Sequence, residues 1–322
     1  MTNVECPMTK ECRNFECQKQ MESASSLFQH SGLVGHSSFV LRLSRRLLAI
    51  GLVYLVLMFF GSLPDHLILF PTRAPIDAGS AARKTVPFEN GELEVWTAES
   101  HRARQQGHAD IFILRFYGNA DRADRWAAAE AGIWNDRAVE IWGMNYPGFG
   151  GSTGPARLSR IGPAAVATFD ELQRQAADRP IVPFGTSIGA TAALHVAASR
   201  PAGIAGLILH NPPPMREMIL RQFGWWNLWL LAGPIALQLP RDLNSIENAK
   251  AIHAPAIFLL AQRDEVVAPR FHRLVVNAYA GEKRVIELRG AYHNDPIEGA
   301  ALADLNNAFD WLLFKASSPR GL

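Results

Sequence analysis

The sequence has no cysteine after residue 17. Its three cysteines, Cys6, Cys12 and Cys17, lie in a polar N-terminal tail at spacings that do not match a C-x-x-C zinc pattern. We therefore expect free thiols in the tail, with a metal site as the less favoured alternative, and no disulfide in the rest of the chain. The sequence predicts no metal and no cofactor.

Charge is also scarce, and neither sign is in excess. The chain has 32 Lys and Arg against 30 Asp and Glu, and only 19% of its residues are charged, compared with about 25% in ordinary globular domains. Because a nucleic-acid-binding protein needs a strongly basic surface, we expect no nucleic acid among the partners.

Long apolar runs are absent except for one near the N-terminus. Residues 47–64 carry no charge and follow Arg42, Arg45 and Arg46. About 18 such residues are just enough to span a bilayer. We therefore predict that residues 40–64 form an uncleaved, single-pass transmembrane signal anchor. The arginines that precede it favour a cytoplasmic N-terminus and a catalytic domain on the non-cytoplasmic side.

Other interpretations of this run remain open. A buried core helix rarely continues so long without a polar face. A cleaved signal peptide would have an unusually long polar start, and no small-x-small site follows Phe60. Ser44-Arg45-Arg46 faintly resembles a twin-arginine export signal. Residues 1–39 have few large apolar side chains and predict a disordered tail, or an over-extended translation start.

Residues 65–318 alternate between apolar strand patterns and helix patterns, which predicts one α/β domain with a mostly parallel sheet covered by helices on both faces. In such a sheet the site lies at the carboxyl ends of the strands. The expected strands are 93–97, 111–116, 139–145, 181–184, 204–210, 256–260 and 284–288, and the expected helices are 121–131, one opening at Pro163, 190–199, 269–279 and 300–315.

The stretch 183–189 reads Pro-Phe-Gly-Thr-Ser-Ile-Gly between an apolar run and an alanine-rich run. This is the G-x-S-x-G pattern of a nucleophile elbow, in which a strained strand-to-helix turn exposes the serine. Ser187 is the candidate nucleophile, and the backbone N–H of Ile188 is a candidate oxyanion donor. By itself the pattern also fits a simple turn.

A nucleophilic serine needs a base and an acid that orients the base, and in this fold they follow in the order Ser, Asp or Glu, His. His293 lies in the loop after the last expected strand, and Asp264 follows the strand before it. Glu265 and Asp295 are the competitors for the acid. We expect Asp295 to cap a local turn.

A second oxyanion donor should come from the loop 116–120, where Gly118 permits close approach and the N–H of Asn119 or Ala120 is the candidate donor. The glycine-rich loop 146–152 lacks the lysine of a phosphate-binding loop and predicts a rim of the pocket. We expect His195, His210 and His253 to be structural.

Taken together, these motifs resemble those of the single-pass, membrane-anchored serine hydrolases of the α/β-hydrolase superfamily. The resemblance covers roughly residues 65–315 and implies the α/β-hydrolase fold with catalytic Ser187, Asp264 and His293 and an oxyanion hole of Asn119 and Ile188. Two departures are Tyr117, where the family has histidine, and Ala268, where proline is usual. The matching segments are Gly118-Asn119-Ala120, residues 146–150, residues 264–267 and His293-Asn294-Asp295.

In this fold a cap would occupy about residues 211–250, which contain Trp225, Trp226 and Trp229. These rings predict either a cap helix over the pocket or a surface that enters the membrane interface. The predicted function is cleavage of carboxylic esters, lipid and acyl-thio esters included. A peptidase or acyltransferase using the same triad is the alternative, and a non-catalytic binding protein is the second.

Overall fold

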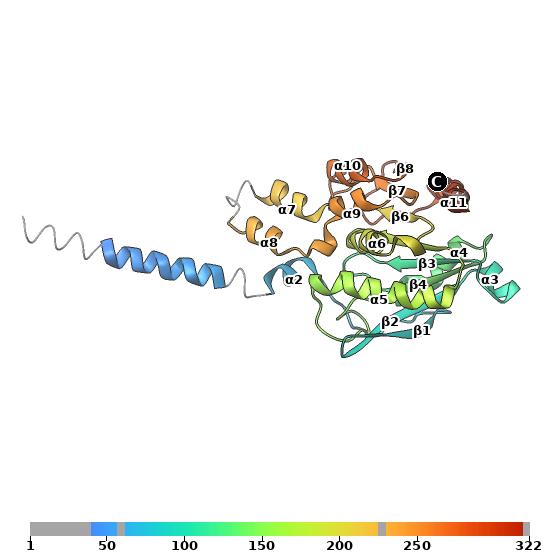
Figure 1. The fold of residues 1–322 in the computed structure, drawn as a ribbon, viewed down its shortest axis with the longest axis horizontal. Coiled ribbons are helices and arrows are strands. Elements are labelled where there is room, and N and C mark those ends of the chain that lie inside the picture. Colours follow the sequence, from blue (N-terminus) through green and yellow to red (C-terminus); the bar gives the residue numbers. More distant parts are fainter. Residues whose placement is uncertain (1–39, 57–61, 225–229, 318–322) are drawn as a thin grey trace, which may run out of the picture. The chain divides into compact units, whose positions relative to one another are not determined.

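A computed structural model of the chain describes residues 40–56, 62–224 and 230–317. The chain divides into two units, Met1–Gly61 and Ser62–Leu322 (Figure 1). Residues 40–56 of the first unit form a helix with mostly exposed side chains. In the described ranges, no helix combines the length and the apolar character needed to cross a membrane. The predicted tail, 1–39, and residues 57–61 of the predicted anchor lie outside these ranges.

The second unit is built on an eight-stranded sheet with the strand order β1-β2-β4-β3-β5-β6-β7-β8. The first two strands pair antiparallel with each other, and β2 pairs antiparallel with β4, whereas the pairs from β4 through β8 are parallel. The prediction of a mostly parallel α/β sheet is therefore confirmed. The strands are β1 (Ala82–Phe88), β2 (Gly91–Glu99), β3 (Ile111–Phe116), β4 (Val139–Met144), β5 (Ile181–Thr186), β6 (Leu207–His210), β7 (Ala256–Ala261) and β8 (Lys283–Leu288).

Helices cover both faces of this sheet (Figure 1). The core on one face includes side chains from α5, α6, α9 and α10, and the core on the other includes side chains from α4 and α11. The helices are α2 (Leu63–Ile68), α3 (His101–Gln106), α4 (Ala123–Ile133), α5 (Leu158–Ala176), α6 (Ile188–Ser199), α7 (Met215–Phe223), α8 (Ala232–Gln238), α9 (Ser245–Ala251), α10 (Pro269–Ala278) and α11 (Gly299–Ser317).

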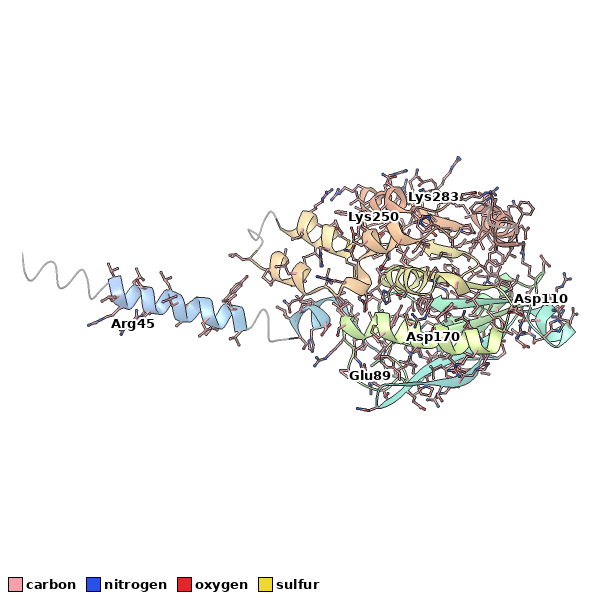
Figure 2. The ribbon with its side chains drawn as sticks, viewed as in Figure 1. Arg45, Glu89, Asp110, Asp170, Lys250 and Lys283 are labelled. Atoms are coloured by element: carbon pink, nitrogen blue, oxygen red, sulfur yellow. The ribbon has the colours of Figure 1, made fainter. Side chains whose placement is uncertain are left out.

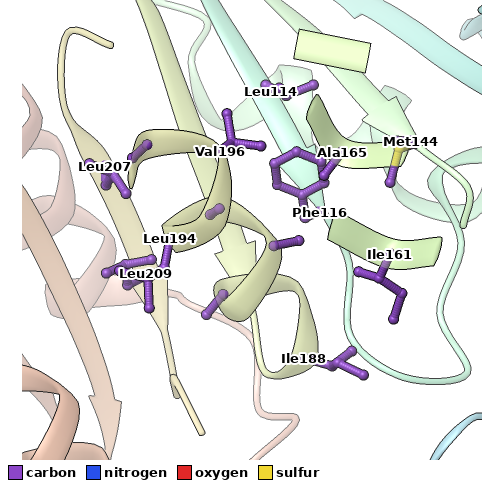
Figure 3. Close-up of a cluster of buried hydrophobic side chains, with 14 of the residues drawn as sticks. Leu114, Phe116, Met144, Ile161, Ala165, Ile188, Leu194, Val196, Leu207 and Leu209 are labelled. Atoms are coloured by element: carbon purple, nitrogen blue, oxygen red, sulfur yellow. The ribbon is translucent and has the colours of Figure 1, made fainter. Parts of the chain in front are cut away.

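Successive side chains of the central strands belong to opposite cores, as the two-residue period of a strand requires. In β3, Leu114 and Phe116 pack on the α5 and α6 side (Figure 3), whereas Ile113 packs on the α4 and α11 side. Charged side chains such as Asp110 and Lys283 lie at the periphery (Figure 2). Each large apolar side chain buried in this way contributes about 1.5–3 kcal/mol, so both faces hold the sheet in place.

The strand β1 and the helix α3 were not expected from the sequence. The edge strand β1 buries only Val86 and Phe88 and leaves its other side chains exposed or half-buried, so it has no continuous apolar run. Helix α3 spans only His101–Gln106 and buries a single alanine, Ala103. Both were missed because their apolar patterns are short, and the pairing of β1 with β2 comes from tertiary structure.

Helix α5 begins at Leu158 rather than at Pro163, so the predicted start is wrong by five residues. Its N-cap residue, Arg157, supplies no side-chain hydrogen bond. Instead, the N–H of Leu158 donates to the carboxylate of Asp65 on α2, at 2.8 Å. A carboxylate at a helix N-terminus satisfies an unpaired N–H and complements the helix dipole. The helix start is thus set by a residue 93 positions away.

Between β6 and β7 the chain forms α7, α8 and α9, in the region where the cap was expected. The tryptophans expected to build it, Trp225, Trp226 and Trp229, lie outside the described residues. Within the described part, α7 packs against α8, and α8 also contacts α2.

Candidate active site

Ser187 occupies the turn between β5 and α6. Its backbone has φ 53° and ψ −124°, a strained conformation for any residue other than glycine. Such strain commonly marks a functional site. The Ser187 N–H donates to the carbonyl of His210 at 2.8 Å, which ties the turn to the end of β6. The serine is only half-buried, so a substrate could reach it.

The two glycines of the elbow pattern are required by close packing. A Cβ on Gly185 would lie 2.3 Å from the carbonyl oxygen of Gly189, and a Cβ on Gly189 would lie 2.2 Å from that of Phe116. These distances are far below van der Waals contact, so no other residue fits without moving backbone. The first turn of α6 is thereby pressed against β5 and the end of β3.

Asp264 and His293 meet at the same edge of the sheet, from the loops after β7 and β8. The Nδ1 of His293 lies 2.6 Å from Asp264 Oδ2, and both side chains are buried. Because an ionised carboxylate can only accept, Nδ1 carries the hydrogen and Nε2 is left to accept a proton. Among the described residues, the Ser187 hydroxyl and His293 make no hydrogen bond with each other; such bonds often tighten only when substrate binds.

The competing acids have other partners. The Glu265 carboxylate accepts the backbone N–H of His293 at 3.1 Å, and the Asp295 carboxylate accepts the N–H of Tyr292 at 2.8 Å. Asp295 therefore closes a local turn, and Glu265 holds the backbone of the histidine loop. Of the three acids, Asp264 is the one that the structure brings to the imidazole ring.

A second histidine on Asp264 was not expected from the sequence. His272 is fully buried on α10, and its Nε2 lies 3.0 Å from the same oxygen, Asp264 Oδ2. The other oxygen, Oδ1, accepts the N–H groups of Val266 and Val267 at 2.9 and 2.6 Å. A signal was present: His272 shares the buried face of α10 with Val275 and Val276, where a histidine needs a polar partner.

These four donors keep Asp264 ionised. Burial works to raise the pKa of Asp264, but hydrogen bonds from His272, His293 and the Val267 N–H lower it well below its ordinary value. Hydrogen bonds to the charged form of a carboxylate have this effect. The carboxylate beside His293 is thus negative at any physiological pH.

His210, expected to be structural, is buried at the end of β6 beside this pair. Burial, together with the nearby Arg115 guanidinium, lowers the pKa of His210 to about 3, so the ring is neutral near pH 7. Its Nε2 lies 3.2 Å from the Asn211 side-chain nitrogen, and its Nδ1 lies 3.5 Å from the Thr186 hydroxyl. Since an amide nitrogen only donates, Nε2 accepts and the hydrogen resides on Nδ1.

Asn211 links three loops at the site. Its side-chain NH2 donates to the carbonyl of His293 at 3.0 Å, and its side-chain oxygen accepts the N–H of Ala261, the last residue of β7, at 2.8 Å. Asn211 has a positive φ of 49°, which asparagine tolerates better than most residues. Because His210 holds Ser187 and Asn211 holds His293, two consecutive residues bring the candidate nucleophile and base to one place.

The loop after β3 lies against the nucleophile. A Cβ on Gly118 would lie 3.8 Å from the Cβ of Ser187. Of the two candidate donors, the Ala120 N–H is already taken by the side-chain oxygen of Asn119, at 3.0 Å. The backbone N–H of Asn119 has no hydrogen bond in the described part of the chain. Ile188 begins α6, so its N–H has no acceptor within the helix.

Side chains of Asn119 and Tyr117 hold this loop from both sides. The Asn119 oxygen also accepts the N–H of Phe70, and its NH2 donates to the carbonyl of Ile68. Tyr117, the departure from the family pattern, is buried and donates to Glu130 at 3.1 Å. Tyr117 therefore anchors the loop from inside the protein, and its hydroxyl is directed at Glu130.

Beneath the site lies Arg115 of β3, whose side chain is buried. It donates to both oxygens of Glu130 at 3.0 Å and to the Thr186 hydroxyl at 2.9 Å. Burial raises the pKa of Glu130 although Arg115 works to lower it. Arg115, paired with Glu130, holds Thr186, the residue before Ser187, and places a fixed positive charge near His210.

The loop 146–152, expected to be a rim of the pocket, contributes mainly to the core. Tyr146 and Phe149 are buried and pack edge to face, with ring centroids 5.7 Å apart. The Tyr146 hydroxyl donates to the carbonyl of Tyr117 at 2.9 Å. The loop thus supports the loop after β3, which carries the candidate oxyanion donors.

Neither of the two described hollows lies at these residues. One is lined by Gln173, Arg179 and Leu313, and the other by residues of β8 and α11. In the ranges that the structure describes, no three His, Cys, Asp or Glu side chains are grouped so that they could hold a metal ion.

Comparison with known proteins supports the fold. No family model matches the chain. An uncharacterized protein of Mycobacterium tuberculosis strain H37Rv is 28% identical over 266 residues, which cover 79% of this chain and 89% of that protein. Among solved structures, the Pyrococcus furiosus esterase Pf2001 aligns with 16% identity over 78% of this chain and 98% of its own, with a TM-score of 0.55.

Two further solved structures agree. Est1E from Butyrivibrio proteoclasticus aligns with 14% identity over 73% of this chain and 99% of its own, with a TM-score of 0.56. The Paleococcus ferrophilus monoacylglycerol lipase aligns with 16% identity over 69% of this chain and 99% of its own, with a TM-score of 0.50. The chain therefore has the α/β-hydrolase fold that these proteins share.

Proposed function

We propose that this α/β-hydrolase-fold protein is a membrane-anchored serine hydrolase that cleaves carboxylic esters. The observation that carries the proposal is the meeting of three loops: Ser187 on a strained elbow, and Asp264 bonded to His293 at 2.6 Å. In this mechanism Ser187 attacks the ester carbonyl while His293 Nε2 takes the serine's proton. The same nitrogen then protonates the leaving alcohol, and Asp264 stabilises the imidazolium that forms.

The oxyanion of the tetrahedral intermediate would be held by the backbone N–H groups of Asn119 and Ile188. Both lie beside Ser187, one on the loop after β3 and the other at the N-terminus of α6, where the helix dipole favours negative charge. The Asn119 side chain holds its loop through Phe70 and Ile68. The donor is thus fixed before the substrate arrives.

The substrate class is argued from the fold's relatives and from the surface. Several neighbours of the same fold are esterases, and one is a monoacylglycerol lipase. On the compact unit, Leu67, Phe70 and Leu237 of α2, the segment after it and α8 are 49%, 57% and 72% exposed. Helix α2 contacts α8, so this apolar surface suits a lipophilic ester or a lipid surface.

Membrane attachment through residues 40–64 is part of the proposal. It is supported by the uncharged run 47–64 and by Arg42, Arg45 and Arg46 before it. These arginines favour a cytoplasmic tail and a hydrolase domain on the non-cytoplasmic side.

The test is reaction with a fluorophosphonate probe together with hydrolysis of p-nitrophenyl esters of increasing chain length. We expect the probe to label one site, and this labelling to be lost in Ser187→Ala. Ester turnover by the variant should fall to the small residual rate that the oxyanion hole and substrate binding still provide. The folded state is checked by circular dichroism. Labelling that persists in Ser187→Ala would mean another nucleophile. A folded native protein that neither reacts nor turns over would instead support a non-catalytic binding protein.

A further inference from the structure

We propose that His272 is a positioning residue of the triad: it holds one lone-pair direction of Asp264 Oδ2, so that His293 is confined to the other. This inference rests on the proposed serine-hydrolase function. It concerns a residue on α10 that touches neither the serine nor the oxyanion loop. It follows from two imidazoles that share one carboxylate oxygen, at 2.6 and 3.0 Å.

The Asp264 carboxylate has no acceptor site to spare. Oδ1 accepts the N–H groups of Val266 and Val267, and Oδ2 accepts His293 and His272. A carboxylate offers about four lone-pair sites, all of which are occupied here. Each imidazole nitrogen that faces it must therefore carry its hydrogen, which defines Nδ1–H for His293 and Nε2–H for His272.

His272 is itself held in place. Its side chain is fully buried on α10, and its Nδ1 lies 3.4 Å from the carbonyl of Pro212, beyond a good hydrogen bond. A buried ring fixed by the helix that carries it is a rigid donor. Without that donor, a buried acceptor site on Oδ2 would be left empty, and the His293 ring could settle on either side of the oxygen.

His272 also shares the negative charge of Asp264. An additional donor makes the carboxylate a weaker partner for a protonated His293. Removing the donor strengthens the interaction between Asp264 and the protonated His293 ring. His293 then stays protonated to higher pH, so activity is lost at a higher pH when the solution is acidified. The acid limb of the pH–rate profile should therefore move to higher pH. A role confined to packing would not move it.

The other charged and titratable groups around the pair come from several elements. Asp264 and Glu265 lie in the loop after β7, His293 in the loop after β8, and His210 at the end of β6. Arg115 on β3 acts on His210. His210, whose pKa is lowered to about 3, is neutral near pH 7, and the Glu265 carboxylate binds the backbone N–H of His293. His272 is one of the smaller influences that lower the pKa of His210, so His210 stays neutral near pH 7 when His272 is replaced. The shift of the acid limb therefore reports on Asp264.

The experiment compares His272→Leu with His272→Gln in the full-length protein. Leucine removes the donor while keeping an apolar volume, whereas the glutamine amide offers an N–H at a similar reach. For His272→Leu we expect kcat for a p-nitrophenyl ester to fall about tenfold, as for a lost charge-assisted hydrogen bond, with KM within about twofold. The acid limb should move up by about one pH unit. His272→Gln should restore most of kcat and return the limb toward its native position.

His195→Leu on α6 is the matched control, since His195 is a largely buried histidine that does not touch Asp264; its kcat should stay within about threefold. The proposal is overturned if His272→Leu keeps native kcat and acid limb. Two further results would overturn it, provided that thermal unfolding shows all variants to be folded. One is a fall in kcat for His272→Leu without a shift of the acid limb of the pH–rate profile. The other is a His272→Gln variant that restores neither kcat nor the position of the acid limb. A native protein that lacks esterase activity and fluorophosphonate labelling would instead refute the proposed function.

Discussion

Asp264 is the residue whose replacement best separates the three nearby acids. We predict that Asp264→Asn lowers kcat by roughly 10³–10⁴, because an amide can present a donor to His293 and favour the wrong tautomer. Glu265→Gln should cost less than about tenfold, since the amide oxygen can still accept the His293 N–H that Glu265 binds at 3.1 Å. Steady-state kinetics on a p-nitrophenyl ester measures both.

Asp295→Asn provides a further comparison, because asparagine can keep the turn-closing bond to the Tyr292 N–H. Its kcat should therefore stay close to native. If Asp264→Asn retained a tenth or more of the native kcat while Glu265→Gln lost most of it, the assignment of the acid would be wrong even though the serine and histidine could still act.

His210 predicts how stability depends on pH. Its pKa is lowered to about 3 in the folded protein by burial and by Arg115, against about 6.5 when unfolded. Between these two pKa values the His210 ring is protonated in the unfolded state but not in the folded state. The contribution of His210 to stability is therefore fully present above about pH 6.5 and is lost as the pH falls. The loss approaches about 1.4 kcal/mol per pH unit. From pH 7 to pH 5 this amounts to about 2 kcal/mol.

His210→Gln should remove this contribution, because an amide does not titrate. We expect the free energy of unfolding in urea to fall about 2 kcal/mol less between pH 7 and pH 5 than in the native protein. His108→Gln, at an exposed histidine, is the control and should behave as native. Equal pH dependence in His210→Gln and the native chain would show that His210 does not titrate as burial implies.

At the scale of elements, the start of α5 depends on a single remote side chain. The Asp65 carboxylate on α2 accepts the Leu158 N–H at 2.8 Å, and no local residue caps the helix. We predict that Asp65→Ala lowers the free energy of unfolding by about 1 kcal/mol, the typical value of an N-cap. Chemical denaturation measures the loss.

Asp178→Ala is the matched control, because Asp178 is an exposed aspartate just beyond the other end of the same helix. Surface substitutions of this kind change stability by less than about 0.5 kcal/mol. Equal effects at both ends would mean that the Asp65 bond contributes nothing beyond an ordinary surface charge.

At the scale of the whole molecule, the membrane proposal is tested with the full chain. We expect the native protein to stay in the membrane pellet after alkaline carbonate extraction. The double variant Leu52→Asp, Leu55→Asp should be released, because each charge at the centre of a spanning helix costs about 2.5–3.5 kcal/mol on insertion scales. Recovery of the native chain in the soluble fraction without detergent, or a mature N-terminus after Ser62, would contradict the anchor.

Much of the architecture was predictable because it depends on local patterns. The strands β3, β5 and β7 are mostly apolar and are buried along almost their whole length, as parallel strands covered on both faces require. The elbow could also be read from the chain, since Gly185 and Gly189 are imposed by close contacts of neighbouring backbone. The positions of Asp264 and His293 just after strands follow from the rule that sites lie at the carboxyl ends of a parallel sheet.

Only the tertiary structure decided which distant groups meet. The sequence determined by itself that the chain alternates strands and helices, that Ser187 lies on a tight turn, and that candidate acids and a histidine follow it in the chain order of the fold. It did not show that His272 shares Asp264 Oδ2 with His293, nor that Asp65 begins α5. Those choices depend on hydrogen bonds between residues on different elements. Such bonds leave no periodic trace in the sequence, because a single buried polar side chain is satisfied by whatever the fold places beside it.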